Sequence, residues 1–370
     1  MATKHCSGGT ELLRKNMCCI LVINIGSTST KVGFYKDRNF FFKETIDHTS
    51  EQMAGLNEFE KWLKFHKRAV DGILDSHGEK IKHLDIAVSR GGLTRPIKTG
   101  AYRITESMLK DLRSGGYGWH PCNVGPEIAY EIANRFEAKA IIYDSPVSDE
   151  MMPIARFSGL KDVKRHAAFH VLSQKSAAKK AASDLKLSYS KSSFIVAHMG
   201  GGITICAHKN GRIIDGTHGI NEGPFTPQRT GTLPLQDLIT LCFSGQFTQK
   251  EINRKLFGQG GVHSYSGTHD IAAVENRISR GDTEAELVLR AMGYQISKEI
   301  CSMAAVLVGK ADAVVLTGNL CKADTVTNEI RNRVISLSPV LIYPDEDELK
   351  SLAEGGLEVL RSFETIRIYI

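Results

Sequence analysis

The sequence predicts an α/β protein in which the second half repeats the plan of the first. Apolar, β-rich runs alternate with amphipathic helical patterns along the 370 residues, as is typical of layered α/β domains. Two of these runs end in glycine turns rich in N–H and hydroxyl donors, Asn24–Lys31 and His198–Thr204. A hairpin pattern follows each turn. The halves therefore share an order of elements and not a repeat of fixed period.

The remaining predicted elements follow in the same alternating order. We expect strands over residues 18–24, 84–89, 140–144, 193–198, 311–317 and 340–343, with hairpins at 31–44 and 204–215. We expect helices over residues 105–113, 127–136, 167–184, 285–308 and 347–363. A second related pair of strand-then-glycine turns lies at 87–92 and 314–319. No low-complexity linker separates the halves, so the predicted joint is continuous chain near 145–153.

Composition narrows the class of protein. With 42% hydrophobic and 24% charged residues, the chain can bury the cores of roughly two domains. A net charge of +6 on a mixed surface does not predict nucleic-acid binding. No stretch approaches the length of a membrane span, and residues 1–17, expected to be a disordered extension, lack the apolar core of a signal peptide. The eight cysteines show no zinc-binding spacing, which indicates reduced thiols in the cytoplasm.

The two glycine turns indicate phosphate binding. Glycine tolerates positive φ and has no Cβ, so backbone N–H groups in such turns can come close to a phosphate. One turn alone is weak evidence, because many glycines only shape hairpins. Two turns, each with hydroxyls or glycines where phosphate oxygens need donors, predict a duplicated nucleotide-binding core.

Five ordered motifs resemble those of the acetate and butyrate kinases. They are residues 24–31, 89–92, 165–170, 198–202 and 223–231. The closer resemblance is to butyrate kinases, through residues 197–202, 223–235 and 241–245. It implies the actin-like ATPase fold, with two ribonuclease H-like α/β domains and a nucleotide cleft between them. Domain I, on the carboxylate side, would comprise 18–147 plus 349–370, and domain II, on the nucleotide side, 148–348.

The resemblance also implies a reaction, the reversible transfer of a phosphoryl group from ATP to a short-chain carboxylate, with butyrate as the first choice. A carboxylate is already ionised at neutral pH, so the site must mainly neutralise and align two anions. Arginine forks suit that task, and the resemblance assigns it to Arg90 and Arg229. It gives His170 the role of donor to the phosphoryl group. Asp144, at a strand end, would orient the substrate or a metal.

Further residues match the nucleotide and metal positions of the family. The resemblance places Asn24, Ser27, Ser29 and Lys31 around the phosphates in domain I, and His198, Gly200, Gly201 and Gly202 around them in domain II. It places Asp270, Gly318 and Asn319 on the adenosine side. Mg²⁺ is expected to bridge the ATP phosphates, held by Asn24 and Glu348. An equal alternative for Glu348 is an acidic residue that complements a helix N-terminus.

Alternative functions stay open at this point. An acetate, propionate or branched-chain fatty acid kinase would use the same mechanism, because one methylene changes binding by only about 1–3 kcal/mol. A non-catalytic nucleotide sensor belongs to another class. Asn319, where the family usually carries glycine, favours the sensor, whereas the retained Arg90, Asp144, His170 and Arg229 favour an enzyme. The family also implies a homodimer or larger homo-oligomer.

Overall fold

The computed structural model describes residues 17–78, 81–345 and 347–370, and these form two compact units. The described residues of Met1–Val147 and Asp347–Ile370 make unit 1, and those of Ser148–Glu346 make unit 2. The chain therefore returns to unit 1 at Asp347, two residues before the expected boundary at 349. Glu348, which we had placed at the end of domain II, lies in unit 1. Apart from Met17, the predicted extension 1–17 lies outside the described residues.

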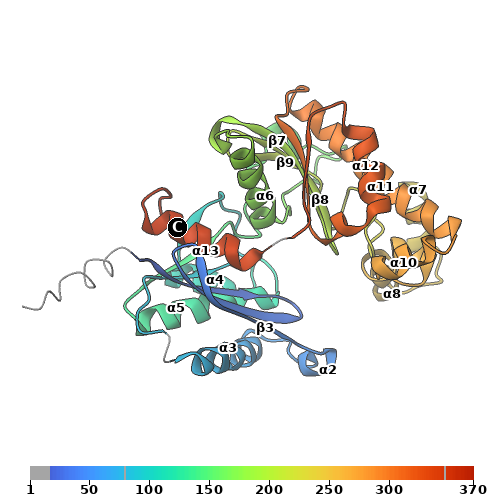
Figure 1. Ribbon diagram of the computed structural model, residues 1–370. Helices are drawn as coiled ribbons and strands as arrows, with labels where there is room; N and C mark the ends of the chain where they lie inside the picture. Colours follow the sequence, from blue (N-terminus) through green and yellow to red (C-terminus); the bar gives the residue numbers. More distant parts are fainter. Residues whose placement is uncertain (1–16, 79–80, 346) are drawn as a thin grey trace, which may run out of the picture. The chain divides into compact units, whose positions relative to one another are not determined.

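Unit 1 is built on a seven-stranded sheet in the order β12-β5-β6-β4-β1-β2-β3; Figure 1 labels strand β3 of this sheet. Its strands are β1 (Cys19–Ile25), β2 (Ser29–Lys36), β3 (Asn39–Asp47), β4 (Ile86–Ser89), β5 (Ala101–Arg103), β6 (Lys139–Tyr143) and β12 (Arg367–Ile368). Its helices are α2 (Ser50–Met53), α3 (Phe59–Ser76), α4 (Glu106–Ser114), the short 3₁₀ helix η2 (Pro121–Val124), α5 (Gly125–Arg135) and α13 (Glu348–Leu360).

Helices cover both faces of this sheet. On one face α3, α4 and α5 share a core with β1 and β2; the sequence analysis missed α3, although its buried residues follow a helical spacing. On the other face α13 lies very close to the strands. A Cβ added to Gly356 would stand 2.8 Å from Val88 and 3.1 Å from Ile20. At the start of α13, Glu348 accepts a hydrogen bond from Asn24 near the end of β1.

Unit 2 is built on a five-stranded sheet in the order β11-β10-β7-β8-β9. Its strands are β7 (Ser193–Met199), β8 (Ile203–Lys209), β9 (Arg212–Gly216), β10 (Ala313–Thr317) and β11 (Val340–Tyr343). Its α-helices are α6 (Val171–Asp184), α7 (Leu235–Phe243), α8 (Gln249–Phe257), α9 (Val262–Ser266), α10 (Ile271–Ile278), α11 (Thr283–Val306) and α12 (Asp324–Val334). Short 3₁₀ helices are η3 (Pro153–Arg156), η4 (Tyr189–Lys191) and η5 (Asn319–Lys322).

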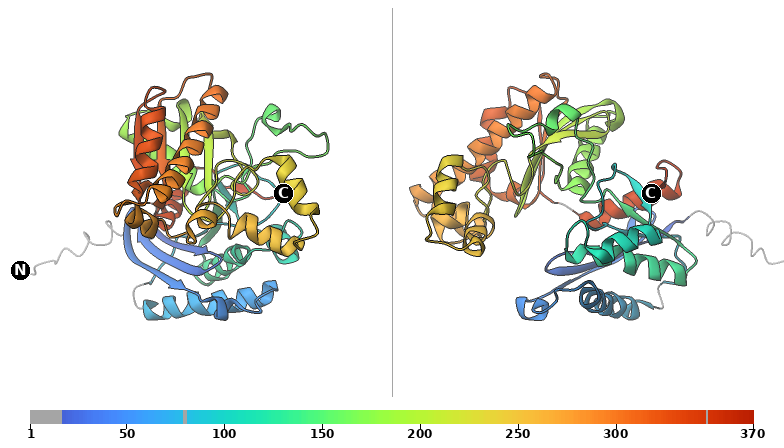
Figure 2. Two further views of the ribbon diagram at one scale, coloured as in Figure 1. Left: turned by 90° about the vertical axis from the view of Figure 1, so that its right-hand side faces the viewer. Right: turned by 180° about the vertical axis from the view of Figure 1, so that it is seen from behind.

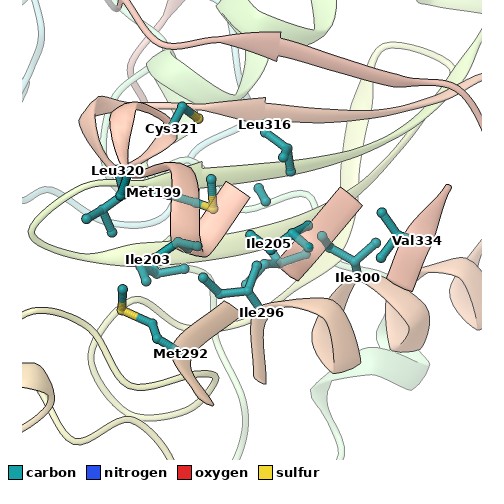
Figure 3. Close-up of a cluster of buried hydrophobic side chains, with 14 of the residues drawn as sticks. Met199, Ile203, Ile205, Met292, Ile296, Ile300, Leu316, Leu320, Cys321 and Val334 are labelled. Carbon is teal, nitrogen blue, oxygen red and sulfur yellow. The ribbon is translucent and has the colours of Figure 1, made fainter. Parts of the chain in front are cut away.

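The unit 2 sheet is also covered on both faces, as the views in Figures 1 and 2 show. On one side the alanines of α6 pack against Phe194 and Val196 of β7. On the other side α11 and α12 form the larger core with alternate residues of β7, β8 and β10. Figure 3 shows Met292, Ile296 and Ile300, one turn apart on α11, beside the β8 side chains.

The predicted duplication is confirmed by the strand pairing. In unit 1, β1 pairs antiparallel with β2 and parallel with β4, and in unit 2, β7 pairs antiparallel with β8 and parallel with β10. The order β3-β2-β1-β4-β6 therefore matches β9-β8-β7-β10-β11. Both hairpins predicted after the glycine turns are present. In the described part of the chain, none of the helices combines the length and apolar character needed to cross a membrane.

Several predicted elements begin or end at other residues, and two of these differences fall at candidate site residues. The helix expected over 167–184 begins at Val171, because His170 adopts the left-handed conformation with φ 50° and ψ 48°. The strand expected over 140–144 ends at Tyr143, because Asp144 has φ 43°. Non-glycine residues at positive φ are uncommon and gather at functional sites.

A buried histidine lies in the core of each unit. In unit 1 the Thr30 hydroxyl bonds to His66 Nδ1 at 2.7 Å and to His48 Nε2 at 2.8 Å. Burial lowers the pKa of His66 to about 4. In unit 2 His208 is fully buried between Tyr189 and Gln174, and burial lowers its pKa to about 3. Both rings are therefore neutral in the folded protein at neutral pH.

We expect the stability of unit 1 to decrease as the pH falls from about 6.5 towards 4. The folded pKa of His66 lies below its unfolded value of about 6.5, so its contribution is present above pH 6.5 and is lost as the pH approaches the folded pKa. The loss amounts to roughly 3 kcal/mol. Urea denaturation followed by tryptophan fluorescence measures it, since the chain's two tryptophans, Trp62 and Trp119, both lie in unit 1.

The variant His66→Gln should show a flatter dependence of unfolding free energy on pH. His269→Gln, at an exposed position in unit 2, is the matched control and should keep the wild-type slope. A slope as steep in His66→Gln as in the wild type would mean that other groups dominate the acid sensitivity.

Candidate functional site

Unit 1 contains a polar cavity of about 240 Å³ at the ends of β1 and β4 and the start of α13. Six of the residues predicted from the sequence come together here. The cavity is lined by Asn24, Gly26, Ser27, Thr28, Ser29, Lys31, Arg90, His120 and Glu348. The first glycine turn is held by the Gly26 N–H, which donates to the Ser29 carbonyl at 2.8 Å.

The charges of this cavity favour an anion. Lys31 Nζ and Arg90 Nη1 each lie 3.7 Å from a Glu348 carboxylate oxygen, too far for strong hydrogen bonds. Within the described residues Arg90 makes no closer ion pair, so its planar fork of donors stays available to a ligand. Two cations face one carboxylate, and phosphate or carboxylate oxygens would balance the difference.

Asn24 and Glu348 fit a magnesium ion by their chemistry. Asn24 Nδ2 donates to Glu348 Oε2 at 2.7 Å, while Asn24 Oδ1 is buried and accepts no hydrogen bond from the described residues. Amide and carboxylate oxygens are ligands that Mg²⁺ accepts. The described residues hold no group of three or more His, Cys, Asp or Glu placed for a metal. Phosphates and water would therefore supply most of the coordination.

His120 is a lining residue that the sequence analysis missed. Its Nδ1 accepts the Cys122 N–H at 3.1 Å at the start of η2. The neutral ring therefore carries its proton on Nε2, where it can donate. Burial, with Arg90 nearby, lowers the pKa of His120. The sequence signal was a lone histidine before Pro121, which nothing in the spacing distinguished from a helix cap.

Asp144 is not among the residues that line this cavity. Its side chain is buried, and its Oδ1 accepts the Gly100 N–H at 2.8 Å. The structure therefore shows Asp144 bonding the start of the β5 segment, at the end of the neighbouring strand β6. Any role as an orienting residue remains a prediction.

In unit 2 the structure brings His170, His198 and the second glycine turn together. The two imidazole rings lie 4.6 Å apart, and His170 Nδ1 lies 3.2 Å from the Thr204 hydroxyl. The turn itself is closed by the Gly200 N–H, which donates to the Gly202 carbonyl at 3.0 Å. Gly201 is exposed and Gly202 is buried, so the turn presents backbone beside the histidine pair.

Arg229 lies beside these histidines and has no counter-charge among the residues of unit 2 that the structure describes. Its Nη1 donates to the Gly219 carbonyl at 2.7 Å; within the described part of the unit it forms no ion pair. Burial alone lowers its pKa. A Cβ at Gly202 would stand 2.8 Å from Arg229 Nη1 and 3.1 Å from His170 Cε1. Only glycine leaves room for both side chains, and a half-buried guanidinium without a carboxylate partner is placed to receive an anion.

The three residues predicted for the adenosine side, Gly318, Asn319 and Asp270, lie in different local environments. Gly318 has φ 95°, and a Cβ there would stand 2.4 Å from the Met199 carbonyl oxygen. Asn319 is exposed at the start of η5 and is not at positive φ. The positive φ of this turn therefore falls on Gly318, the residue before Asn319. Asp270 caps α10, accepting the N–H groups of Ala272 and Ala273.

Comparison with known proteins shows which family this chain belongs to. Residues 155–361, more than half of the chain, match the acetokinase family. This chain belongs to the acetokinase family. The match includes His170, the second glycine turn, Arg229 and Glu348.

Solved structures show which fold this acetokinase family member has. The acetate kinase of Porphyromonas gingivalis matches with a TM-score of 0.77 at 19% identity, covering 93% of this chain and 100% of that one. The propionate kinase of Francisella tularensis subsp. tularensis matches with a TM-score of 0.72 at 18% identity, covering 92% of this chain and 99% of that one. The acetate kinase of Entamoeba histolytica matches with a TM-score of 0.69 at 16% identity, covering 91% of this chain and 98% of that one. The predicted actin-like ATPase fold is confirmed; identities this low say nothing further.

The missing counter-charge predicts how Arg229 affects stability. We expect Arg229→Met to lower the unfolding free energy of unit 2 by no more than about 1 kcal/mol, because the lost hydrogen bond is offset by removal of a desolvated charge. Arg156→Met is the contrast, since it leaves the buried Asp149 carboxylate unpaired. Arg156→Met should lower the unfolding free energy by about 3 kcal/mol. Scanning calorimetry measures both; an equal loss in both variants would mean that Arg229 is a structural residue.

Proposed function

We propose that this protein catalyses reversible phosphoryl transfer from ATP to a short-chain carboxylate, with butyrate as the preferred acid, giving an acyl phosphate and ADP. The observation that carries the proposal is Arg229, a half-buried guanidinium with no carboxylate partner among the described residues of its unit, beside a glycine turn and His170. Family membership supports the same reaction class.

The proposed step is a direct in-line displacement. A carboxylate oxygen of the acid attacks the γ-phosphorus of ATP, and the bond from that phosphorus to the β,γ-bridging oxygen breaks as ADP leaves. No general base is needed, since the carboxylate is already ionised. Arg90 would hold the carboxylate, and Arg229 and His170 would hold the equatorial phosphoryl oxygens, where charge develops. The Thr204 hydroxyl orients His170.

The remaining site residues would bind the nucleotide. Backbone N–H groups of Gly201 and Gly202 in unit 2, with Gly200, His198 and Gly318 beside them, would surround the phosphates. Ser27, Ser29 and Lys31 of unit 1 would supply hydroxyl and ammonium donors. When bound, Mg²⁺ would neutralise phosphate charge, and Asn24 and Glu348 are the residues placed to hold it. Asp144 would orient the acid, and Asn319 and Asp270 would border the adenosine.

The preference for butyrate rests on the motifs that resemble butyrate kinases. The structural neighbours named above are acetate and propionate kinases, and they do not separate these acids. A pocket that selects by volume gains only about 1–3 kcal/mol per methylene. Acetate, propionate and branched acids are therefore the alternative substrates.

Acyl phosphate formation, trapped as a hydroxamate, tests the reaction. With purified protein, Mg-ATP and acetate, propionate, butyrate and isobutyrate in parallel, we expect kcat/KM to be highest for butyrate. A maximum at acetate would keep the reaction and change the substrate. Arg229→Ala should reduce turnover by about 1,000-fold or more while ATP binding persists. No turnover with any acid, despite ATP binding, would support a nucleotide sensor instead.

Glu348 and magnesium give a second test of the site. We expect Glu348→Gln to raise the Mg²⁺ concentration for half-maximal turnover by about 10-fold, because the site loses a charged oxygen ligand. Glu354→Gln, on the same helix but outside the cavity, is the matched control and should leave the Mg²⁺ dependence unchanged. Equal dependence in both variants would favour the helix N-terminal role of Glu348.

We also propose that the enzyme acts in the cytoplasm as a homodimer or larger homo-oligomer, with no nucleic-acid or membrane partner. The seven cysteines in the described part of the chain are free thiols, in keeping with a reducing compartment. Light scattering on the purified protein gives the number of subunits.

A further inference from the structure

Arg165 forms the most extensive side-chain network near the unit 2 site, and the proposed reaction gives it no role. Its Nε and Nη2 donate to the two oxygens of Glu222 at 3.2 and 3.0 Å. Its Nη1 donates to Asp215 at 3.1 Å and to the Ala155 carbonyl at 2.7 Å, and Nη2 also donates to the Gly216 carbonyl at 2.8 Å. All the nitrogens of the fork are therefore occupied within the unit, and none is left for a ligand.

Glu222 closes the short turn that runs from His218 to Glu222. Its Oε1 accepts the His218 N–H at 3.0 Å. The His218 ring closes the turn from the other side, because its Nδ1 accepts the N–H groups of Ile220 and Asn221, both at 3.2 Å. Burial lowers the pKa of His218, which keeps Nδ1 an acceptor. The Arg165 fork thus fixes one carboxylate, and that carboxylate fixes the turn.

The centre of this turn contacts both proposed phosphoryl-binding residues. The Gly219 carbonyl accepts Arg229 Nη1 at 2.7 Å, the one hydrogen bond that holds this guanidinium in the described part of the unit. A Cβ at Gly219 would stand 3.3 Å from His170 Cε1 and 3.1 Å from the Thr204 methyl group. The Gly219 N–H donates to the Ala168 carbonyl at 3.1 Å, close to His170 in sequence. A shift of the turn would therefore move Arg229 directly.

We propose that Arg165 is a positioning residue for Arg229, acting through Glu222 and the carbonyl of Gly219. The inference rests on the proposed phosphoryl transfer, in which Arg229 binds the transferring group. Lysine cannot replace Arg165, because an ammonium keeps the charge but cannot bond both Glu222 oxygens and the backbone carbonyls in one plane. Arg165→Lys therefore changes the geometry of the site and leaves the net charge of the site unaltered.

The test compares Arg165→Lys with Arg113→Lys. Arg113 is a matched control, since its Nε and Nη2 hold the two oxygens of Glu127 at 2.9 and 2.6 Å, in the same fork geometry but in unit 1. We expect Arg165→Lys to lower kcat on the order of 10- to 100-fold with little change in KM for ATP, because positioning is lost mainly in the transition state. Arg113→Lys should keep wild-type kcat.

A double variant separates positioning from general damage. If Arg165 acts through Arg229, then Arg165→Lys should lower kcat by less than about 2-fold once Arg229→Lys is present. Additive losses in the double variant would overturn the proposal, as would a kcat in Arg165→Lys equal to that of Arg113→Lys. Should Arg165→Lys fail to fold, Glu222→Gln breaks the same link with less loss of shape and should follow the same pattern.

A turnover-independent measurement distinguishes this inference from the proposed function. In an NMR spectrum of protein labelled at its arginines, the Nε–H signal of Arg229 is assigned by its disappearance in Arg229→Lys. This signal should shift or broaden in Arg165→Lys and stay unchanged in Arg113→Lys. If the wild type phosphorylates no acid, the proposed reaction fails, yet the Arg229 signal still decides the link. An unchanged signal in Arg165→Lys would overturn it.

Discussion

The site in unit 2 depends on two glycines, Gly202 and Gly318, whose backbone lies so close to neighbouring groups that a Cβ would not fit. Side chains of Arg229 and His170 fill the space beside Gly202, and the turn after β10 touches the Met199 carbonyl at Gly318. The first contact lies at the turn after β7 and the second joins the ends of the neighbouring parallel strands β7 and β10. Without them Arg229 would have no recess in which to stay charged and free of a carboxylate partner.

Much of the fold could be predicted from the sequence because its signals were local. Apolar runs ending in glycine turns marked β1 and β7, and the hairpins after them made the duplication visible. The helix α3 was missed, although its apolar residues follow a helical period, because Glu58 at its N-cap makes no side-chain capping bond and is not a residue type that marks a helix start. The start of α6 was placed too early, since sequence periodicity cannot reveal a left-handed residue such as His170.

The site was only partly predictable, for a different physical reason. Residues within the glycine turns, such as Asn24 and Gly202, carried their own motif and were found. His120 has no motif of its own, and only the fold places it in one cavity with Arg90. Arg165 bonds Glu222, which lies 57 positions away in the sequence. Only folding reveals that, among the described residues, Arg229 is held by a carbonyl and by no carboxylate.

The discontinuous path of unit 1 has a consequence for how the chain is made. Helix α13 packs on β1 and β4 through Gly356, yet it lies near the C-terminal end of the chain. During synthesis the first sheet emerges from the ribosome with one apolar face uncovered until residue 360 has been added. Unit 2, by contrast, is one continuous segment of the chain. The nascent first half must therefore wait, exposed to chaperones and to other chains, for the last helix.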